Sequence, residues 1–210
     1  MRKTITAVLG CLAAALVAAP SAAAQSVGGC QLQGTANFSP GLNASSQPFS
    51  YSFTGNLSGC QSSQSGAPTT GAVAAGVTVT KQVVNSVTGA TDTVTYQMPV
   101  PTGTGSCGSS TTKGQSVATW ADGSTTVVSY STTGALAAVQ LSGSVAPSMT
   151  LTAVNGAAGD PTTYTISTTR YAGDTAGGVL AFQPPDPTAC NTPTGVTQAG
   201  ISGGLGLGSP

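Results

Sequence analysis

The sequence predicts an all-β fold, a single-domain antiparallel β-sandwich or barrel of about nine or ten short strands. Three observations carry this prediction. Many short segments alternate between apolar and polar residues, clusters of Gly, Pro, Asn and Ser separate them, and no long segment has the helical 3.6-residue period. The part of the chain expected to be exported contains four cysteines, which predicts two disulfides in this fold.

The first residues have the pattern of a secretory signal peptide. Two basic residues precede an apolar run of about 15 residues, and three alanines at positions 22–24 follow it. A membrane-spanning helix needs roughly 20 apolar residues, so we expect cleavage after Ala24 and a mature protein without an integral membrane segment. We therefore assign residues 1–24 to a signal peptide and expect a secreted, extracellular protein, free or associated with the cell surface. Lipidation of Cys11 is a disfavoured alternative, because few apolar residues precede it.

Alternation is clearest in residues 30–38 and 49–57, which are predicted to form two half-buried strands. The side chains expected on the inner faces are Cys30, Leu32, Gly34, Ala36 and Phe38 in the first and Phe49, Tyr51, Phe53, Gly55 and Leu57 in the second. Turn residues join the two segments, so we expect antiparallel neighbours with Phe38 opposite Phe49.

The cysteines of the mature chain are predicted to pair as Cys30–Cys60 and Cys107–Cys190. The expected register places Cys30 and Cys60 at the same end of the first strand pair, within bridging distance. Cys107 lies in GTGSCG, which has the spacing of a phosphate-binding loop. The lysine that a P-loop needs after its last glycine is replaced by Ser109, and no helical period follows. We therefore interpret these glycines as a tight turn that presents Cys107 to its partner.

Similar patterns continue through the rest of the chain. Further strands are expected in residues 77–83, 94–98, 116–120, 125–130, 139–145, 149–151 and 164–166, with Asp122-Gly123 as a hairpin turn. We therefore place the all-β domain at residues 25–200 and expect the glycine-rich residues 201–210 to form a flexible tail.

Charge and composition exclude several classes of function. After signal cleavage three bases (Lys81, Lys113, Arg170) remain against five aspartates, a net charge of −2, which is too little positive charge for nucleic-acid binding. His and Glu are absent, which removes Ser–His–Asp and Cys–His catalysis and His-based metal sites. We predict no catalytic residue and no cofactor. The alternatives are a hydrolase with a noncanonical Asp or Ser–Lys site, and a single structural Ca²⁺ held by turn aspartates.

Trp120 and Asp122 are the candidate binding residues. Trp120 is the single tryptophan and stands beside the Asp122-Gly123 turn. We expect its ring to be buried at the edge of the core. The alternative is an exposed platform on which a sugar or peptide stacks, with Asp122 as a hydrogen-bond acceptor.

Three motifs carry a resemblance to a known group of proteins. C-x-L-x-G-x-A-x-F from Cys30, F-x-Y-x-F-x-G-x-L-x-x-C from Phe49 and W-x-D-G-S from Trp120 together resemble small exported β-proteins of actinobacterial type that have no established activity. The resemblance covers about half of the mature chain and implies an exported β-protein without implying a reaction. We expect a non-enzymatic module that binds cell-envelope glycan or protein weakly through flat polar strand faces. A structural surface-layer component is a further alternative.

Overall fold

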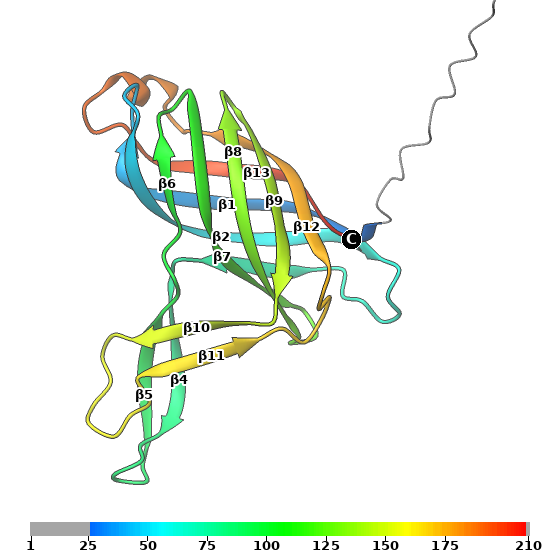
Figure 1. The fold of residues 1–210 in the computed structure, drawn as a ribbon, viewed down its shortest axis with the longest axis vertical. Coiled ribbons are helices and arrows are strands. Elements are labelled where there is room, and N and C mark those ends of the chain that lie inside the picture. The colour runs from blue at the N-terminus through cyan, green and yellow to red at the C-terminus, as the bar shows by residue number, and fades with distance from the viewer. Residues whose placement is uncertain (1–25, 209–210) are drawn as a thin grey trace, which may run out of the picture.

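The computed structural model describes residues 26–208, so the predicted signal peptide and Cys11 lie outside the described residues. Within them the chain forms thirteen β-strands and one short 3-10 helix (Figure 1). The elements are β1 (Ser26–Leu42), β2 (Gln47–Ser62), β3 (Gly71–Ala75), β4 (Thr78–Val84), β5 (Thr91–Gln97), β6 (Thr102–Gly105), β7 (Ser109–Trp120), β8 (Thr125–Ala135), β9 (Ala138–Ala146), β10 (Ser148–Ala153), β11 (Thr163–Ser167), β12 (Thr175–Gln183), η1 (Pro187–Asn191) and β13 (Val196–Gly208). The all-β prediction is confirmed, and it follows from the β-branched residues that fill these segments.

Eight strand positions close into a barrel. The sheet runs in the order β1-β13-β12-β9-β8-β7-β3-β2, and β1 also pairs with β2, which closes the ring. These pairings are antiparallel, and most neighbours in the ring are also neighbours along the chain. Closure leaves no free edge around the ring. Of the predicted sandwich or barrel, the barrel is thus confirmed and the sandwich is wrong. The predicted count of about nine or ten strands is also wrong, because the described residues form thirteen.

One position of the barrel is shared by two strands. β3 pairs with β2 at residues 53–57, and β6 pairs with the same strand at residues 47–50. Both also pair with β7, at different ends of it. Between β3 and β6 the chain leaves the barrel to form β4 and β5, and it leaves again between β9 and β12 to form β10 and β11.

The two excursions build a second sheet in the order β11-β10-β5-β4 (Figure 1). Its buried residues pack against the outer faces of β7 and β8, through Val117 and Val127. The other members of this cluster are Val94, Tyr96, Met98, Met149 and Leu151. At this place β7 is apolar on both faces because one face lines the barrel and the other is covered by the second sheet.

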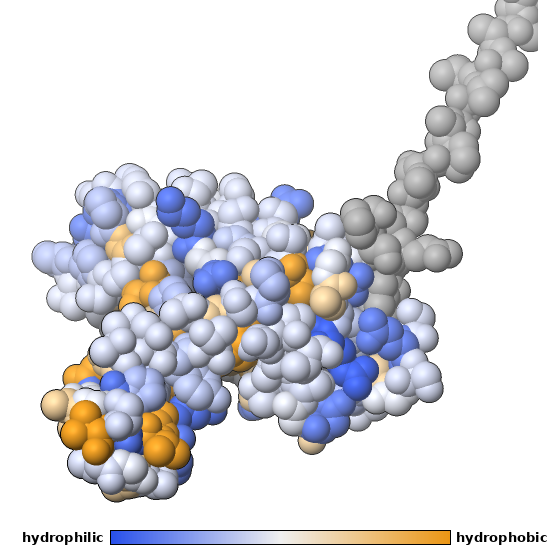
Figure 2. Space-filling view, turned by 60° about the horizontal axis from the view of Figure 1, so that its bottom comes forward, coloured by the Kyte–Doolittle hydropathy of each residue, from blue (hydrophilic) through white to orange (hydrophobic). Residues whose placement is uncertain are grey.

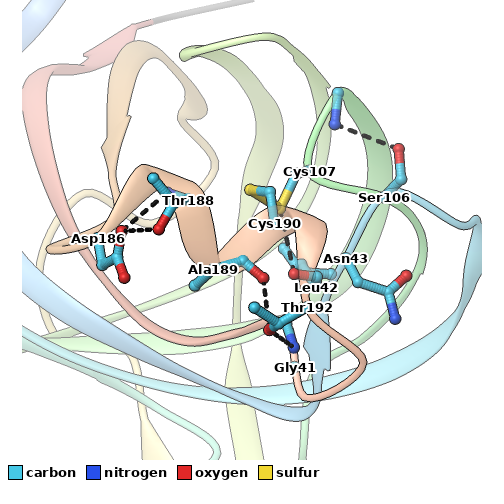
Figure 3. Close-up of a disulfide and its surroundings, with 12 residues drawn as sticks. Gly41, Leu42, Asn43, Ser106, Cys107, Asp186, Thr188, Ala189, Cys190 and Thr192 are labelled. Carbon is cyan, nitrogen blue, oxygen red and sulfur yellow. Dashed lines mark hydrogen bonds between the residues drawn. A yellow bond between two sulfur atoms is a disulfide. The ribbon is translucent and has the colours of Figure 1, made fainter.

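A disulfide holds each end of the barrel. Cys30–Cys60 joins β1 to β2, with 4.1 Å between the Cα atoms. At the opposite end Cys107–Cys190 joins the β6–β7 turn to η1, with 6.0 Å between the Cα atoms (Figure 3). The Asp186 side chain accepts a hydrogen bond from the Thr188 N–H and so caps the start of η1. Both predicted pairings are confirmed.

The register of the first strand pair differs from the predicted one. Phe38 lies opposite Tyr51 rather than Phe49. The inner faces are nevertheless as predicted, because a shift of two residues keeps every side chain on the same face. An irregularity between Gly29 and Gln31 then allows Cys30 to reach Cys60.

β13 replaces the predicted flexible tail, which is wrong for residues 201–208. This strand pairs with β1 on one side and with β12 on the other, so it completes the ring. Ile201, Leu205 and Leu207 pack against the barrel core. Gly204 and Gly206 lie at the alternate positions that face outward, whereas Gly203 lies on the inner side, opposite Leu32 and Leu180, where a side chain would collide with the neighbouring backbone. The abundance of glycine therefore concealed a strand with period two.

Candidate functional site

The barrel interior contains two adjoining cavities. The larger has a volume of about 130 Å³ and the smaller of about 80 Å³. They share Val73, Ser116, Leu141 and Leu205 as lining residues, so they lie one above the other along the barrel. An eight-stranded barrel is just wide enough for side chains to fill it or for one small ligand to fit. Here the side chains leave part of that space unfilled.

Aromatic side chains surround the larger cavity. All four phenylalanines of the chain line it: Phe38, Phe49, Phe53 and Phe182. The Phe38 ring centroid lies 5.9 Å from those of both Phe49 and Phe182, each in an edge-to-face arrangement. Such contacts hold the rings in fixed orientations around the space.

A row of four hydroxyl groups also lines the larger cavity. Tyr51 Oη lies 2.7 Å from Tyr130 Oη and 3.2 Å from Thr112 Oγ1, and Thr112 Oγ1 lies 2.7 Å from Thr132 Oγ1. The row spans β2, β7 and β8, and Thr112 is opposite Thr132 in the register. The even-numbered residues of β7 and β8 face inward here, and they include the polar residues Thr112, Tyr130 and Thr132.

The environment keeps the two tyrosines neutral. Burial raises the pKa of Tyr51, although hydrogen bonds with Thr112 and Tyr130 oppose the rise. Burial also raises the pKa of Tyr130, and the charge and hydrogen bond of Tyr51 act in the same direction. No Asp, Lys or Arg of the described chain lines either cavity. The site is therefore apolar, uncharged and supplied with hydroxyl donors and acceptors.

Trp120 lines the smaller cavity. Its side chain is 6% exposed, and its ring packs edge-to-face on Tyr171 with 5.5 Å between centroids. Its Nε1–H donates to Thr126 Oγ1 at 2.9 Å. Trp120 thus takes the buried position, and its ring does not form the exposed stacking platform that was the alternative.

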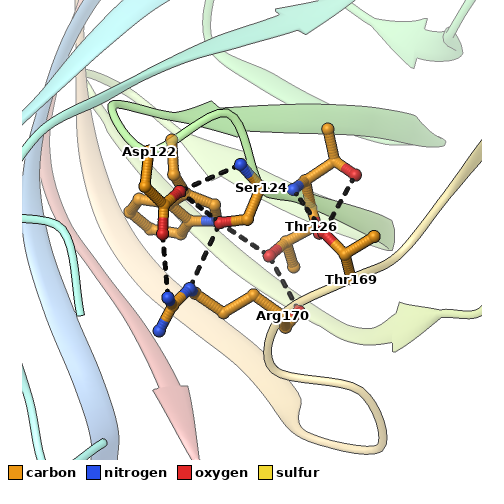
Figure 4. A network of polar contacts seen from close by, with 7 residues as sticks. Asp122, Ser124, Thr126, Thr169 and Arg170 are labelled. Atoms are coloured by element: carbon orange, nitrogen blue, oxygen red, sulfur yellow. Dashed lines mark hydrogen bonds and ion pairs between the residues drawn. The ribbon is translucent and has the colours of Figure 1, made fainter. Parts of the chain in front are cut away.

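Asp122 lies in the β7–β8 turn and takes part in a polar network (Figure 4). Its carboxylate accepts hydrogen bonds from the N–H and the hydroxyl of Ser124, and Arg170 Nη2 lies 2.8 Å from it. These Ser124 contacts, followed by Arg170, lower the pKa of Asp122. The Arg170 contact of this network joins the turn to the segment after β11. The structure therefore does not combine Trp120 and Asp122 into one binding site.

The other aspartates lie apart from the cavities. Asp92 and Asp160 both accept hydrogen bonds from Nδ2 of Asn85, at 3.1 and 2.9 Å, and Asn85 is 2% exposed. Asp174 has a buried Oδ2 that finds no hydrogen-bond partner in the described part of the chain, and burial raises its pKa. Residues 26–208 contain no group of three or more His, Cys, Asp or Glu side chains that could share a metal ion.

The outer surface is mainly uncharged and polar. The space-filling view shows pale colours over most of the visible face, with apolar side chains gathered on the part formed by the second sheet (Figure 2). Exposed valines there are Val84, Val87 and Val154, at the ends of β4 and β10 and in the β4–β5 turn. In residues 26–208 no helix has the length and hydropathy needed to cross a membrane.

The cavity residues include several that the sequence interpretation did not select. Tyr51, Phe38 and Phe49 were expected on an inner face, but Tyr130, Thr112 and Thr132 were not singled out. The signal for Tyr130 and Thr132 was the alternation through residues 126–132, and that for Thr112 the alternation through residues 110–120, in which every second residue faces inward. Threonine is mostly exposed in proteins, so its presence in these segments did not indicate an interior position.

Comparison with known protein families, with curated proteins and with solved structures finds no match to this chain. The resemblance to small exported actinobacterial proteins therefore stays a prediction.

Proposed function

We propose that this is an exported, non-enzymatic binding protein whose binding site is the interior of the barrel. Its ligand is a small apolar molecule. The observation that carries the proposal is the larger cavity of about 130 Å³, lined by all four phenylalanines and by no charged side chain of residues 26–208. Ligand sites are typically concave and mostly apolar, with a few polar groups that fix orientation. This cavity has that composition.

The energetic cost of the cavity supports the proposal. Empty space in a core destabilises a protein by about 24 cal/mol per Å³, so a cavity of about 130 Å³ costs on the order of 3 kcal/mol. That is a large fraction of the roughly 5–15 kcal/mol by which a domain is stable. A ligand that fills the space offsets this cost. An engineered apolar cavity of about 150 Å³ is known to hold benzene, so a single-ring compound has the right size.

The interior is favoured over the outer strand faces. One such polar strand face is that of β2, formed by Ser50, Ser52, Thr54 and Asn56, which alternate with the inward-facing residues of the strand. They offer no enclosed space, and their hydroxyls and amides are equally suited to solubility. Weak contact with cell-envelope glycan or protein is thus the less specific proposal.

Toluene tests the proposed site. We expect toluene to raise the melting temperature of the mature protein, because a ligand that binds only the folded state stabilises it. In Val73→Phe the added ring projects from a residue that lines both cavities, so the stabilisation by toluene should disappear. Val179→Phe is the matched control, since Val179 is 66% exposed on the outside of the barrel, and it should respond like the wild type. Absence of any effect on the wild type, measured also by calorimetric titration, overturns the proposal.

Export is a separate part of the proposal. The two disulfides are consistent with an oxidising extracellular environment. Intact-mass measurement of the protein from the culture medium should give a chain that begins at Gln25. A chain recovered only from the cytosol with residues 1–24 attached contradicts this part without affecting the binding site.

Assembly through the second sheet is the second candidate function. The outer strands of this sheet, β4 and β11, pair on one side only within the described chain, and exposed valines lie at its end. Unpaired strand edges are templates for association. Sedimentation over a hundredfold range of concentration decides the point, because a surface-layer component should associate and a carrier should remain monomeric.

A further inference from the structure

The row of hydroxyls in the larger cavity contains one hydrogen atom more than its hydrogen bonds use. Tyr51, Thr112, Tyr130 and Thr132 each carry one hydroxyl hydrogen, and three hydrogen bonds connect the four groups. Among the described residues these hydroxyls make no other side-chain hydrogen bond. One donor is therefore unused inside an apolar space, where an unsatisfied polar group carries an energetic cost.

We propose that the larger cavity binds a neutral, single-ring aromatic carbonyl compound, with its ring among the phenylalanines and its carbonyl oxygen accepting the unused hydroxyl hydrogen. The proposal rests on the proposed function, because it names the class of molecule that the same cavity takes. A carbonyl oxygen is an acceptor without a hydrogen of its own. It satisfies the row of hydroxyls without adding a further donor that needs a partner.

The aromatic part of the ligand follows from the lining. The rings of Phe38, Phe49 and Phe182 form consecutive edge-to-face contacts, and Tyr51 lies 6.0 Å from Phe38 between centroids. A flat ring of similar size can continue this arrangement and gain the extra attraction that aromatic pairs have beyond simple burial. An alkyl chain of equal volume lacks that attraction.

The neutrality of the ligand follows from the absence of charged groups around it. Lys81, Lys113 and Arg170 are the only bases of the described residues, and none lines the cavity. A carboxylate placed there would lose its water without gaining a positive partner, at a cost far above that of a neutral group. The site should therefore reject the acid that corresponds to each aldehyde it binds.

Three ligands of matched size test these points: toluene, benzaldehyde and benzoate. Binding is measured by calorimetric titration of the mature protein at pH 7. Because toluene and benzaldehyde differ in their own hydrophobicity, the informative quantity is the ratio of their dissociation constants in different variants. Benzoate should show no binding at concentrations that saturate benzaldehyde.

The variant that removes the row is Tyr51→Phe/Thr112→Val/Tyr130→Phe/Thr132→Val. It removes all four hydroxyls together, so none is left buried without its partners, and replacing such groups by apolar ones of the same shape is close to neutral for stability. We expect the preference for benzaldehyde over toluene to fall by about two- to tenfold, the usual effect of one hydrogen bond. Thr111→Val/Thr133→Val is the control, because these exposed threonines are paired on the outer face of the same two strands. Its preference should equal that of the wild type.

The outcomes separate this inference from the proposed function. If toluene binds neither the wild-type protein nor Thr111→Val/Thr133→Val, the cavity is not a ligand site and both proposals fail. If toluene binds but the preference for benzaldehyde is the same in the four-residue variant, or if benzoate binds as tightly as benzaldehyde, only this inference is overturned. Toluene binding to the four-residue variant reports that its cavity is intact. Should that variant not fold, the carbonyl stretching frequency of benzaldehyde bound to the wild type decides instead. A hydrogen bond to the row should lower this frequency below its value in an alkane solvent, and an unshifted frequency overturns this inference.

Discussion

The hydroxyl oxygens of Tyr51 and Tyr130 lie 2.7 Å apart inside the barrel, although 79 positions separate the two residues in the chain. They come from β2 and β8, which are not neighbours in the ring: β7 and the position shared by β3 and β6 lie between them. Their contact defines the polar part of a cavity that is otherwise apolar.

The two tyrosines make stability depend on alkaline pH. Burial raises the pKa of both, so in the folded protein they stay protonated at a pH at which the unfolded chain, with a tyrosine pKa near 10, ionises. Their contribution is therefore complete below about pH 10 and is lost as the pH rises above it, by up to about 1.4 kcal/mol per pH unit for each tyrosine. Urea unfolding between pH 8 and about 11.5 should show this slope, and Tyr51→Phe/Tyr130→Phe should reduce it. An equal slope in both proteins contradicts the assignment.

The hydrogen bond from Trp120 to Thr126 stabilises one end of the barrel. In Thr126→Val the indole N–H loses its acceptor at a position where Thr126 is 0% exposed, so the free energy of unfolding should fall by about 1–3 kcal/mol. Thr119→Val, on the exposed face beside Trp120, is the control and should change stability little. Because Trp120 is the single tryptophan, acrylamide quenching of its fluorescence reports its burial directly. Ready quenching in the folded wild type contradicts the buried position.

Two adjacent glycines test whether β13 is a strand of the barrel. A Cβ at Gly203 would collide with the carbonyl oxygen of Val179, whereas a Cβ at Gly204 would meet no atom within 4 Å. Gly203→Ala should therefore lower the melting temperature by several degrees, and Gly204→Ala should have little effect, as thermal unfolding will show. In a flexible tail the two substitutions would be indistinguishable.

Asp174 is expected to destabilise the protein at neutral pH. Its Oδ2 is buried without a hydrogen-bond partner among the described residues, and burial raises its pKa, so the folded state holds this proton more tightly than the unfolded state does. At acidic pH the protonated Asp174 side chain contributes favourably to the free energy of unfolding, and this contribution is lost as the pH rises through the raised pKa. Asp174→Asn should thus increase stability at pH 7 by less than about 1 kcal/mol, because the residue is only partly buried. Chemical denaturation at pH 3 should show no gain.

The disulfide between Cys107 and Cys190 should contribute more to the free energy of unfolding than the one between Cys30 and Cys60. The sequence separations are 83 and 30 residues, and in the chain-entropy model the longer loop stabilises by about 1 kcal/mol more. Cys107→Ser/Cys190→Ser should lower the free energy of unfolding by about 2–5 kcal/mol. Denaturation under non-reducing conditions compares the two double variants. A larger loss in Cys30→Ser/Cys60→Ser goes against the expected order.

Much of the barrel could be predicted from the sequence because its strands alternate strictly. Phe38 and Leu57 were placed on inner faces from local pattern alone, and both disulfides followed from the first strand pair. The register was wrong by two residues, since pattern determines the face of a strand and not its alignment with a neighbour. β13 was missed because glycine supplies no pattern at the outer positions.

The candidate site was harder to predict. Trp120 was expected to be buried, and it is, but the meeting of Tyr51 with Tyr130 depends on how the sheet curves from β2 through β7 to β8. Nothing within either segment encodes it. The second sheet presents a similar limit, because Val117 and Val127 look like ordinary strand residues until β5 and β10 are known to cover them.

Closure of the ring by β1 and β13 also has a consequence for how the protein reaches its final form. Leu32 of β1 pairs with Gly203 of β13, so β1 cannot complete its pairing until β13 has been synthesised. Other barrel neighbours, such as β1 and β2 or β7, β8 and β9, are close in the chain and can pair earlier. Contacts so distant in the chain form slowly, and until then β1 and β12 each present an open edge to other molecules. A polypeptide in which β13 has not yet paired therefore remains prone to aggregation, and the pairing of β13 with β1 and β12 encloses the interior.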